Sequence, residues 1–269
     1  MTTMGFRLAL LIGLILPAAA LAAQSEWSVA DQSRVRLLLT EPGADGLIEG
    51  GVEVMLEPGW HTYWRNPGET GVPPVFDFSA SENVADVEVF YPAPERYDDG
   101  ASVSLIYRDE VVFPLTVVPR DAGEPVVLRA ELQFGVCEDI CVPTRASAEL
   151  MLPLLPPPDP LAEARLERFR SRLPAPAEAG LFDIENVTAE EDALLVDIRM
   201  PDSTYSDLFV DPPSGWYIGQ PEFLSREEGV SRYRLSLTGQ PADKPVEGQI
   251  FHFVAVAGGK AIEEAVTMH

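Results

Sequence analysis

The sequence predicts an all-β protein of two β-sandwich domains, joined by a proline-rich connector and one short helix. Roughly nine short segments before residue 153 alternate apolar and polar side chains between turn residues, which is typical of a sandwich rather than of β–α–β layering. The 269 residues include 25 prolines and 20 glycines, a composition that favours β structure with many turns. Only one stretch has the apolar spacing of an amphipathic helix.

The chain is long enough for two modest domains. Its hydrophobic fraction of 46% supplies sizeable cores, and roughly 245 residues remain after an N-terminal leader. The expected segments are a signal peptide at 1–23, a first sandwich at 24–155, the connector and helix at 156–176, and a second β-sandwich at 177–269.

The N-terminus has the pattern of a secretory signal peptide. Arg7 precedes an apolar run over residues 8–23, which Pro17 interrupts and which is short for a membrane span. Small residues close the run, so we expect cleavage near Ala22, the alternative being an uncleaved anchor. We expect an exported chain with no membrane insertion after cleavage, since no later stretch approaches the ~18 apolar residues of a transmembrane helix.

The charge excludes one class of partner. The formal net charge is -24 at pH 7, and such a field repels nucleic acid and anionic membrane surfaces. We therefore expect no nucleic-acid partner.

The first domain is expected to contain short strands separated by turns. They are predicted at residues 26–30, 33–39, 47–56, 75–78, 84–90, 105–107, 111–118, 126–134 and 145–152. Gly50-Gly51 interrupts the third of these segments and predicts a bulge there. Residues 91–100 are rich in proline, aspartate and glycine and are expected to form a loop.

Residues 60–64 form an aromatic segment between two turns. Alternation puts Trp60 on one face, and His61 and Tyr63 on the other. Two interpretations remain open: these side chains have a packing role alone, or one aromatic face lines the cysteine site described below.

After the first domain, the sequence predicts one helix and then a second set of strands. Asp159-Pro160 supplies an N-cap and a proline at the first helical position, which predicts a helix of about 14 residues. Further strands are predicted at 181–187, 193–200, 207–210, 216–218, 222–225, 231–237, 249–257 and 261–267, with a hairpin turn at Gly258-Gly259. We interpret the second half as a docking or spacer module, because it has no cysteine and no cluster of titratable side chains.

The chain has two cysteines, Cys137 and Cys141, with three residues between them. The flanking segments at 127–134 and 145–152 alternate like half-buried strands. The pair is therefore expected at the turn of a β-hairpin, near the surface and within bonding reach of itself.

Three chemical roles suit such a pair. A structural disulfide is one, although a ~5-residue ring contributes about 2 kcal/mol against nearly 5 for a ring of ~100 residues. A metal site is another: with His61 or His252 the cysteines fall short of a zinc set, whereas copper(I) needs few soft ligands. The third is thiol–disulfide exchange.

The exchange role fits a relay that works inside a docked complex. Glu138 and Asp139 lie between the cysteines and disfavour a free thiolate through like-charge repulsion, which Arg145 is expected to offset in part.

Several motifs together resemble a known family. They are Gly59-Trp60-His61-Thr62-Tyr63-Trp64-Arg65, Ile106-Tyr107-Arg108-Asp109, Phe113-Pro114-Leu115, and Phe134-Gly135-Val136-Cys137 through Cys141-Val142-Pro143. In this order they are similar to the N-terminal periplasmic domain of the thiol:disulfide interchange protein DsbD, and most of all to the suppressor-of-copper-sensitivity (ScsB) type. The resemblance covers about residues 26–155, and the second half looks like the extra domain of the ScsB type.

The resemblance implies an immunoglobulin-like sandwich with a redox-active Cys137–Cys141 disulfide, located in the periplasm. It implies that Cys141 forms mixed disulfides and that Cys137 resolves them, without a cofactor. It further implies a cap at residues 95–100, with Tyr97 as the lid and Glu95 and Asp98 as acidic cap residues. Trp60, His61 and Tyr63 are expected at the rim of the site.

The resemblance also implies partners. Thioredoxin-like periplasmic proteins are expected to receive electrons. The chain has neither the membrane-spanning nor the thioredoxin-like domain of DsbD, so we expect a separate membrane protein as electron donor. Its three-residue cysteine spacing is shorter than that of DsbD and matches the ScsB type. Copper(I) binding by Cys137 and Cys141, and a pure interaction module with a structural disulfide, remain the alternatives.

Overall fold

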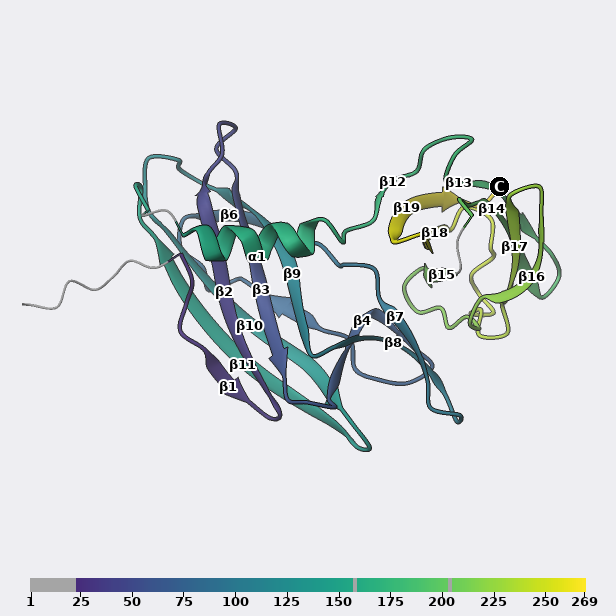
Figure 1. Ribbon diagram of the computed structural model, residues 1–269, viewed down its shortest axis with the longest axis horizontal. Coiled ribbons are helices and arrows are strands. Elements are labelled where there is room, and N and C mark those ends of the chain that lie inside the picture. Colours follow the sequence, from purple (N-terminus) through teal and green to yellow (C-terminus); the bar gives the residue numbers. More distant parts are fainter. Residues whose placement is uncertain (1–22, 157–158, 203–204) are drawn as a thin grey trace, which may run out of the picture.

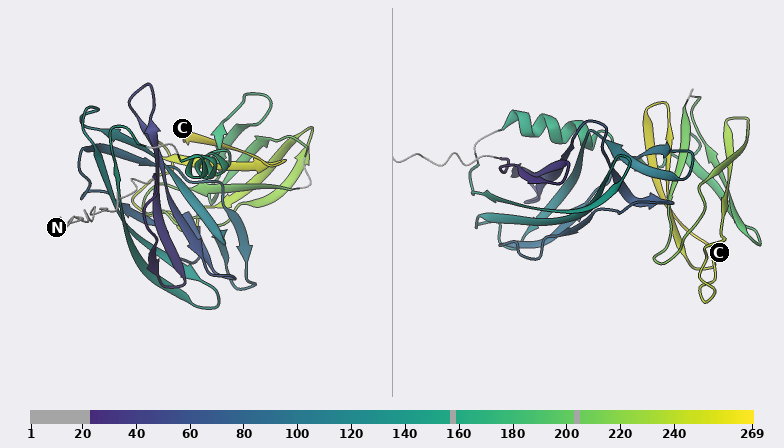
Figure 2. Two further views of the ribbon diagram at one scale, coloured as in Figure 1. Left: turned by 60° about the vertical axis from the view of Figure 1, so that its left-hand side comes forward. Right: turned by 90° about the horizontal axis from the view of Figure 1, so that it is seen from below.

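The computed structural model describes residues 23–156, 159–202 and 205–269. These residues form two β-sandwiches that lie side by side along the long axis of the molecule (Figures 1 and 2), so the all-β class is confirmed. The predicted signal peptide with its cleavage near Ala22 lies outside the described residues, as does part of the proline-rich connector.

The first sandwich consists of two sheets. One contains β1 (Ser28–Ala30), β2 (Ser33–Pro42), β3 (Ile48–Leu56), β9 (Glu110–Pro119) and β6 (Val84–Val89), in that spatial order. The other contains β11 (Cys141–Leu152), β10 (Val126–Cys137), β4 (His61–Gly68), β8 (Val103–Arg108) and β7 (Glu95–Asp98), in that order, and β5 (Val75–Asp77) pairs with β10. The segment predicted as a loop at 91–100 thus contains an edge strand, β7.

Both faces of the first sheet are covered. Leu37, Leu38 and Leu39 of β2 are all buried although they are consecutive, which requires a partner on each face because adjacent strand residues point in opposite directions. The second sheet covers one face. Helix α1 (Pro160–Arg170) crosses the other (Figure 1) and contributes Leu166 and Phe169 to the same core. The helix therefore packs as part of the first sandwich.

One of the paired glycines of β3, Gly51, allows this helix contact. The register runs without interruption from Leu38↔Gly51 to Leu39↔Gly50, so the predicted bulge is wrong; the irregularity lies between Leu39 and Pro42 instead. A Cβ on Gly51 would lie 2.5 Å from Val112 Cγ1 and 2.7 Å from Leu166 Cδ2. Glycine is needed here for close approach of the helix rather than for a turn.

Replacing Gly51 with alanine is expected to destabilise the first domain by about 1–3 kcal/mol, because the new methyl group overpacks the sheet–helix contact. The measurement is the midpoint of thermal unfolding. Gly123→Ala is the matched control, since its Cβ would meet only the flexible Asp121 carboxylate, at 3.1 Å. Equal midpoints for the two variants would show that the helix does not pack at Gly51.

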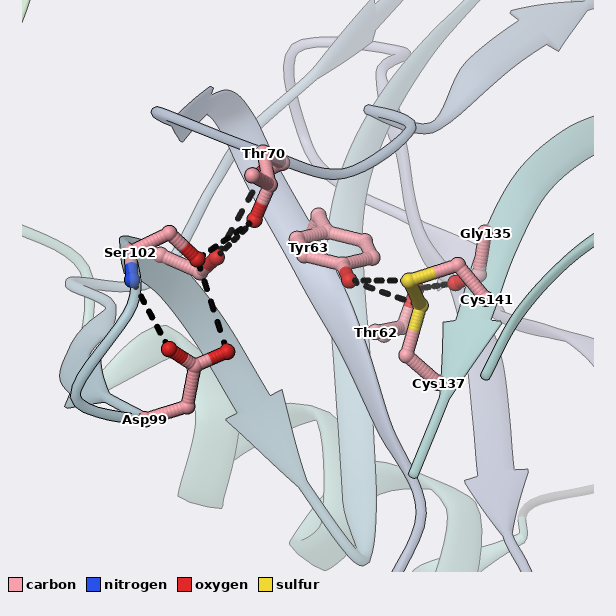
Figure 3. The surroundings of a disulfide bond; sticks show 9 residues. Thr62, Tyr63, Thr70, Asp99, Ser102, Gly135, Cys137 and Cys141 are labelled. Atoms are coloured by element: carbon pink, nitrogen blue, oxygen red, sulfur yellow. Dashed lines mark hydrogen bonds between the residues drawn. A yellow bond between two sulfur atoms is a disulfide. The ribbon is translucent and has the colours of Figure 1, made fainter. Parts of the chain in front are cut away.

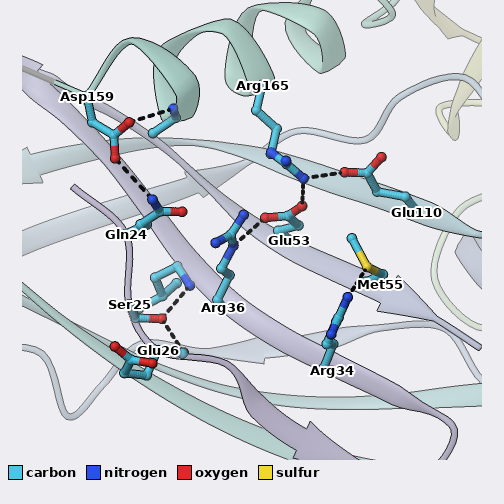
Figure 4. Close-up of polar contacts among 12 residues, drawn as sticks. Gln24, Ser25, Glu26, Arg34, Arg36, Glu53, Met55, Glu110, Asp159 and Arg165 are labelled. Atoms are coloured by element: carbon cyan, nitrogen blue, oxygen red, sulfur yellow. Dashed lines mark hydrogen bonds and ion pairs between the residues drawn. The ribbon is translucent and has the colours of Figure 1, made fainter. Parts of the chain in front are cut away.

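A buried carboxylate fixes the helix to the sheet (Figure 4). Glu53 is 0% exposed and accepts hydrogen bonds from Arg36 Nε at 2.6 Å and from Arg165 of the helix. Arg165 also pairs with Glu110 at 2.8 Å. Burial raises the pKa of Glu53, and the hydrogen bond from Arg36 opposes this shift. At the start of the helix, Asp159 accepts from the Leu161 and Ala162 amides as the predicted N-cap.

The second sandwich has its own core, built around Trp216, Phe251 and Phe253. Its strands are β12 (Ala175–Pro176), β19 (Lys260–Thr267), β18 (Ile250–Ala257) and β15 (Ser206–Asp211) in one sheet, and β13 (Asp183–Ala189), β14 (Ala193–Arg199), β17 (Val230–Ser236) and β16 (Glu222–Glu227) in the other. The strand predicted at 216–218 is only an isolated bridge from Tyr217 to Gly239. The turn predicted at Gly258-Gly259 is present, with both residues at positive φ.

In the described part of the chain, no helix has the length and apolar character needed to span a membrane.

Candidate functional site

The two cysteines close a long β-hairpin, as predicted. Strands β10 and β11 pair in continuous register from Val126↔Leu152 to Cys137↔Cys141. The cysteines are joined by a disulfide, with their Cα atoms 4.2 Å apart. The three residues of the tip are all exposed, among them Ile140 at 73%.

The two cysteine residues differ in their exposure to solvent. Cys137 is 1% exposed, whereas Cys141 is an exposed residue. The sheet explains the difference, because Cys137 lies on the inner strand β10 and also pairs with His61 of β4, whereas Cys141 lies on the edge strand β11. The two cysteines of the disulfide are therefore unequal in exposure.

The hydroxyl of Tyr63 makes hydrogen-bond contacts with both sulfurs of the disulfide. It donates to Cys137 Sγ at 2.7 Å and lies 3.1 Å from Cys141 Sγ (Figure 3). Burial raises the pKa of Tyr63 to about 12, with smaller contributions from Asp99 and Tyr97. The phenol is thus protonated at neutral pH, and its hydroxyl is available as a donor to a thiolate formed on reduction.

Two glycines make the slot for this ring. A Cβ on Gly71 would lie 2.2 Å from Tyr63 Cε1, and one on Gly135 would lie 3.2 Å from Cε2. Gly71 has φ +113, a conformation open to glycine. Thr62 holds the strand in register by donating to the Gly135 carbonyl at 2.8 Å.

His61 lies between two tyrosine rings. Its centroid is 5.4 Å from that of Tyr63 and 5.2 Å from that of Tyr97. Burial, and then the charge of Arg108, lowers the pKa of His61, so the imidazole is neutral at pH 7. It contributes ring packing beside the disulfide and no positive charge.

Tyr97 covers the small cluster that contains Cys137. It packs half-buried against Tyr63, Ile106 and Cys137. The guanidinium of Arg108, on β8, lies 4.6 Å from the centroid of the Tyr97 ring. The sequence placed Tyr97 at the site, but the contributions of Ile106 and Arg108 were missed, although both lie in the second motif of the resemblance.

The described contacts of the other predicted residues are with groups other than the sulfurs. Trp60 packs partly buried against the main core. Glu95 is exposed and pairs with Arg108 at 3.7 Å, and Asp98 accepts from the Gly100 amide in the β7–β8 turn. Arg145 pairs with Gln133, four residues along β11 from Cys141. Whether Arg145 offsets part of the charge of the acidic tip stays a prediction.

No group of three or more His, Cys, Asp or Glu side chains able to hold a metal ion occurs among the described residues. The copper(I) alternative therefore stays a prediction based on the cysteines.

Comparison with known proteins extends the description. Residues 36–153 match the family model described as "Thiol:disulfide interchange protein DsbD, N-terminal". The crystal structure of the N-terminal periplasmic domain of ScsB from Proteus mirabilis matches with a TM-score of 0.74 and 25% identity, covering 91% of this chain and 98% of that chain. The predicted resemblance and the immunoglobulin-like all-β fold are thus confirmed, and the match supports a thiol–disulfide exchange module.

A marsupial T cell receptor also aligns with 88% of this chain and 97% of its own, but at 10% identity and a TM-score of 0.22. Among the curated proteins, none matches this sequence.

Proposed function

We propose that the first domain is a periplasmic dithiol–disulfide relay that passes reducing equivalents through Cys137 and Cys141 to the disulfides of partner proteins. The observation that carries this proposal is the unequal pair: an exposed Cys141 bonded to a buried Cys137, with the Tyr63 hydroxyl in contact with both sulfurs. Such a bond joins one exposed residue to one buried residue, an asymmetry that a purely structural staple does not need.

Reduction of the pair proceeds in two exchanges. A donor thiolate attacks Cys141 Sγ, forms a mixed disulfide and breaks the Cys137–Cys141 bond, and Cys137 leaves as a thiolate that the Tyr63 hydroxyl stabilises. A second donor thiol then attacks the mixed disulfide and releases Cys141. The donor is oxidised to a disulfide, and the pair gains two electrons.

Delivery of electrons reverses the roles. The Cys141 thiolate attacks a partner disulfide, and Cys137 then attacks the Cys141 sulfur and releases the reduced partner. We propose thioredoxin-like periplasmic proteins as the acceptors and a separate membrane protein as the donor. The chemistry uses no cofactor, and Tyr97 limits access to the pair.

The test is covalent trapping during expression in the periplasm. Cys137→Ser leaves Cys141 without a resolving thiol, so thioredoxin-like partners are expected to stay attached to it and to be released by dithiothreitol. The matched control is the Cys137→Ser/Cys141→Ser double variant, which is expected to hold none. Finding no thioredoxin-like adduct on the single variant, or the same adducts on the double variant, would refute the relay.

A further inference from the structure

The strand that carries the lid is attached to two domains. Within the described residues, strand β7 is the edge of its sheet and pairs only with β8, through four residue pairs from Glu95↔Ile106 to Asp98↔Val103. Adjacent residues on a strand point to opposite faces. Tyr97 faces the disulfide cluster, and its neighbour Arg96 faces the second sandwich.

Arg96 is held by the second domain on all three of its guanidinium nitrogens. Its Nε and Nη2 donate to the two carboxylate oxygens of Asp207 at 2.8 and 2.7 Å, Nη1 donates to Gln220 Oε1 at 2.8 Å, and Nη2 also donates to the Leu208 carbonyl at 3.0 Å. The side chains of Arg96 and Asp207 are 23% and 12% exposed. A shielded, bidentate contact of this kind fixes geometry better than an exposed ion pair.

Asp207 and Leu208 belong to β15. This strand also contacts β4, which carries His61 and Tyr63. Strand β15 accepts a hydrogen bond from Asn66 Nδ2 at its Val210 carbonyl, at 2.6 Å, and its Asp211 pairs with Arg65 at 2.9 Å. Phe209 of β15 belongs to the core of the first sandwich and meets the Trp64 ring at 6.3 Å between centroids. Strand β15 thus contacts both strands that supply aromatic side chains to the disulfide site: β7, which carries Tyr97, and β4, which carries His61 and Tyr63.

We propose that the second domain holds the cover of the disulfide in place, with Arg96 and Asp207 as positioning residues that set how readily a thiol opens the Cys137–Cys141 bond. The inference rests on the proposed function and gives the second domain a role in it. A four-residue edge strand has few contacts of its own and opens readily. The Arg96 contacts add the restraint that keeps Tyr97 over the cluster, so their loss moves the equilibrium toward an open site.

The experiment measures the rate at which dithiothreitol reduces the Cys137–Cys141 bond in the whole oxidised chain, by alkylating the freed thiols at timed intervals. Arg96→Met keeps the aliphatic stem and removes every polar contact, and it is expected to speed reduction about tenfold. Arg232→Met is the matched control, because Arg232 makes a similar bidentate pair with Asp197, at 2.6 and 2.8 Å, within the second sandwich. It is expected to react at the wild-type rate.

A double variant separates positioning from general loosening. Tyr97→Ala removes the lid itself, so Arg96→Met is expected to add nothing in that background. The inference is overturned if Arg96→Met reacts like wild type, or if its acceleration is retained in full in the Tyr97→Ala background. Asp207→Asn, which removes the charge from the second-domain side, is expected to behave like Arg96→Met and decides the matter if that variant does not fold.

These outcomes also separate this inference from the relay proposal. If Tyr97→Ala accelerates reduction and Arg96→Met does not, the second domain has no hold on the cover, and the relay stands. If wild type and Tyr97→Ala both resist dithiothreitol, the relay and the role given to the second domain are both overturned.

Discussion

Cys137→Ser is expected to react with a small aromatic disulfide about 100-fold faster than Cys141→Ser, because only the first variant keeps an accessible thiol. Cys141 is exposed and Cys137 is 1% exposed. The chain has no other cysteine, so each variant reports a single sulfur. The measurement is the rate of release of nitrothiobenzoate from 5,5′-dithiobis(2-nitrobenzoate) at pH 8.

The control for intrinsic reactivity is the same pair of variants in guanidinium chloride, where both thiols are expected to react at similar rates. The account is contradicted if the folded variants react equally fast, or if the Cys137 thiol left by Cys141→Ser is the faster one. Either result would remove the division between an attacking cysteine and a resolving cysteine.

Tyr63→Phe is expected to raise the pKa of the attacking thiol, Cys141, by about 1–2 units in the reduced protein. The lost hydroxyl lies 2.7 and 3.1 Å from the two sulfurs, and a hydrogen bond to a charged group is worth roughly 1.5–3 kcal/mol. Because a thiol with a raised pKa is protonated over a wider pH range, the pH at which alkylation by iodoacetamide becomes fast should move upward. The measurement is the alkylation rate as a function of pH.

Tyr217→Phe is the control, since Tyr217 belongs to the second domain and is 53% exposed. It is expected to leave the pH profile unchanged. An unchanged or lowered thiol pKa in Tyr63→Phe would mean that the hydroxyl is a packing contact and does not stabilise a thiolate.

The hairpin and the location of the cysteines could be predicted because they depend on local patterns. Alternating side chains fix which residues face the core, and the only two cysteines stand where two alternating segments end. The same alternation correctly put His61 and Tyr63 on one face. It did not identify the Tyr63 hydroxyl as the contact to both sulfurs, since that depends on the space left by Gly71 and Gly135.

The errors arose where one residue type serves two purposes or where distant segments meet. Glycine pairs occur both in bulges and in close contacts, so Gly50-Gly51 was misinterpreted. The cap was expected to be a loop, whereas pairing with β8 makes part of it a strand. The contact of Arg96 with Asp207 joins two domains, and no local pattern in the sequence indicates such a contact.

The central claim is that the Cys137–Cys141 bond is opened and closed in use. Its most direct test is the reduction potential of the pair in the whole chain, measured at equilibrium against glutathione or dithiothreitol mixtures. We predict a reversible two-electron transition between about −270 and −180 mV, the range of exchange-active pairs. A potential below about −300 mV, where structural disulfides resist reduction, would contradict the account.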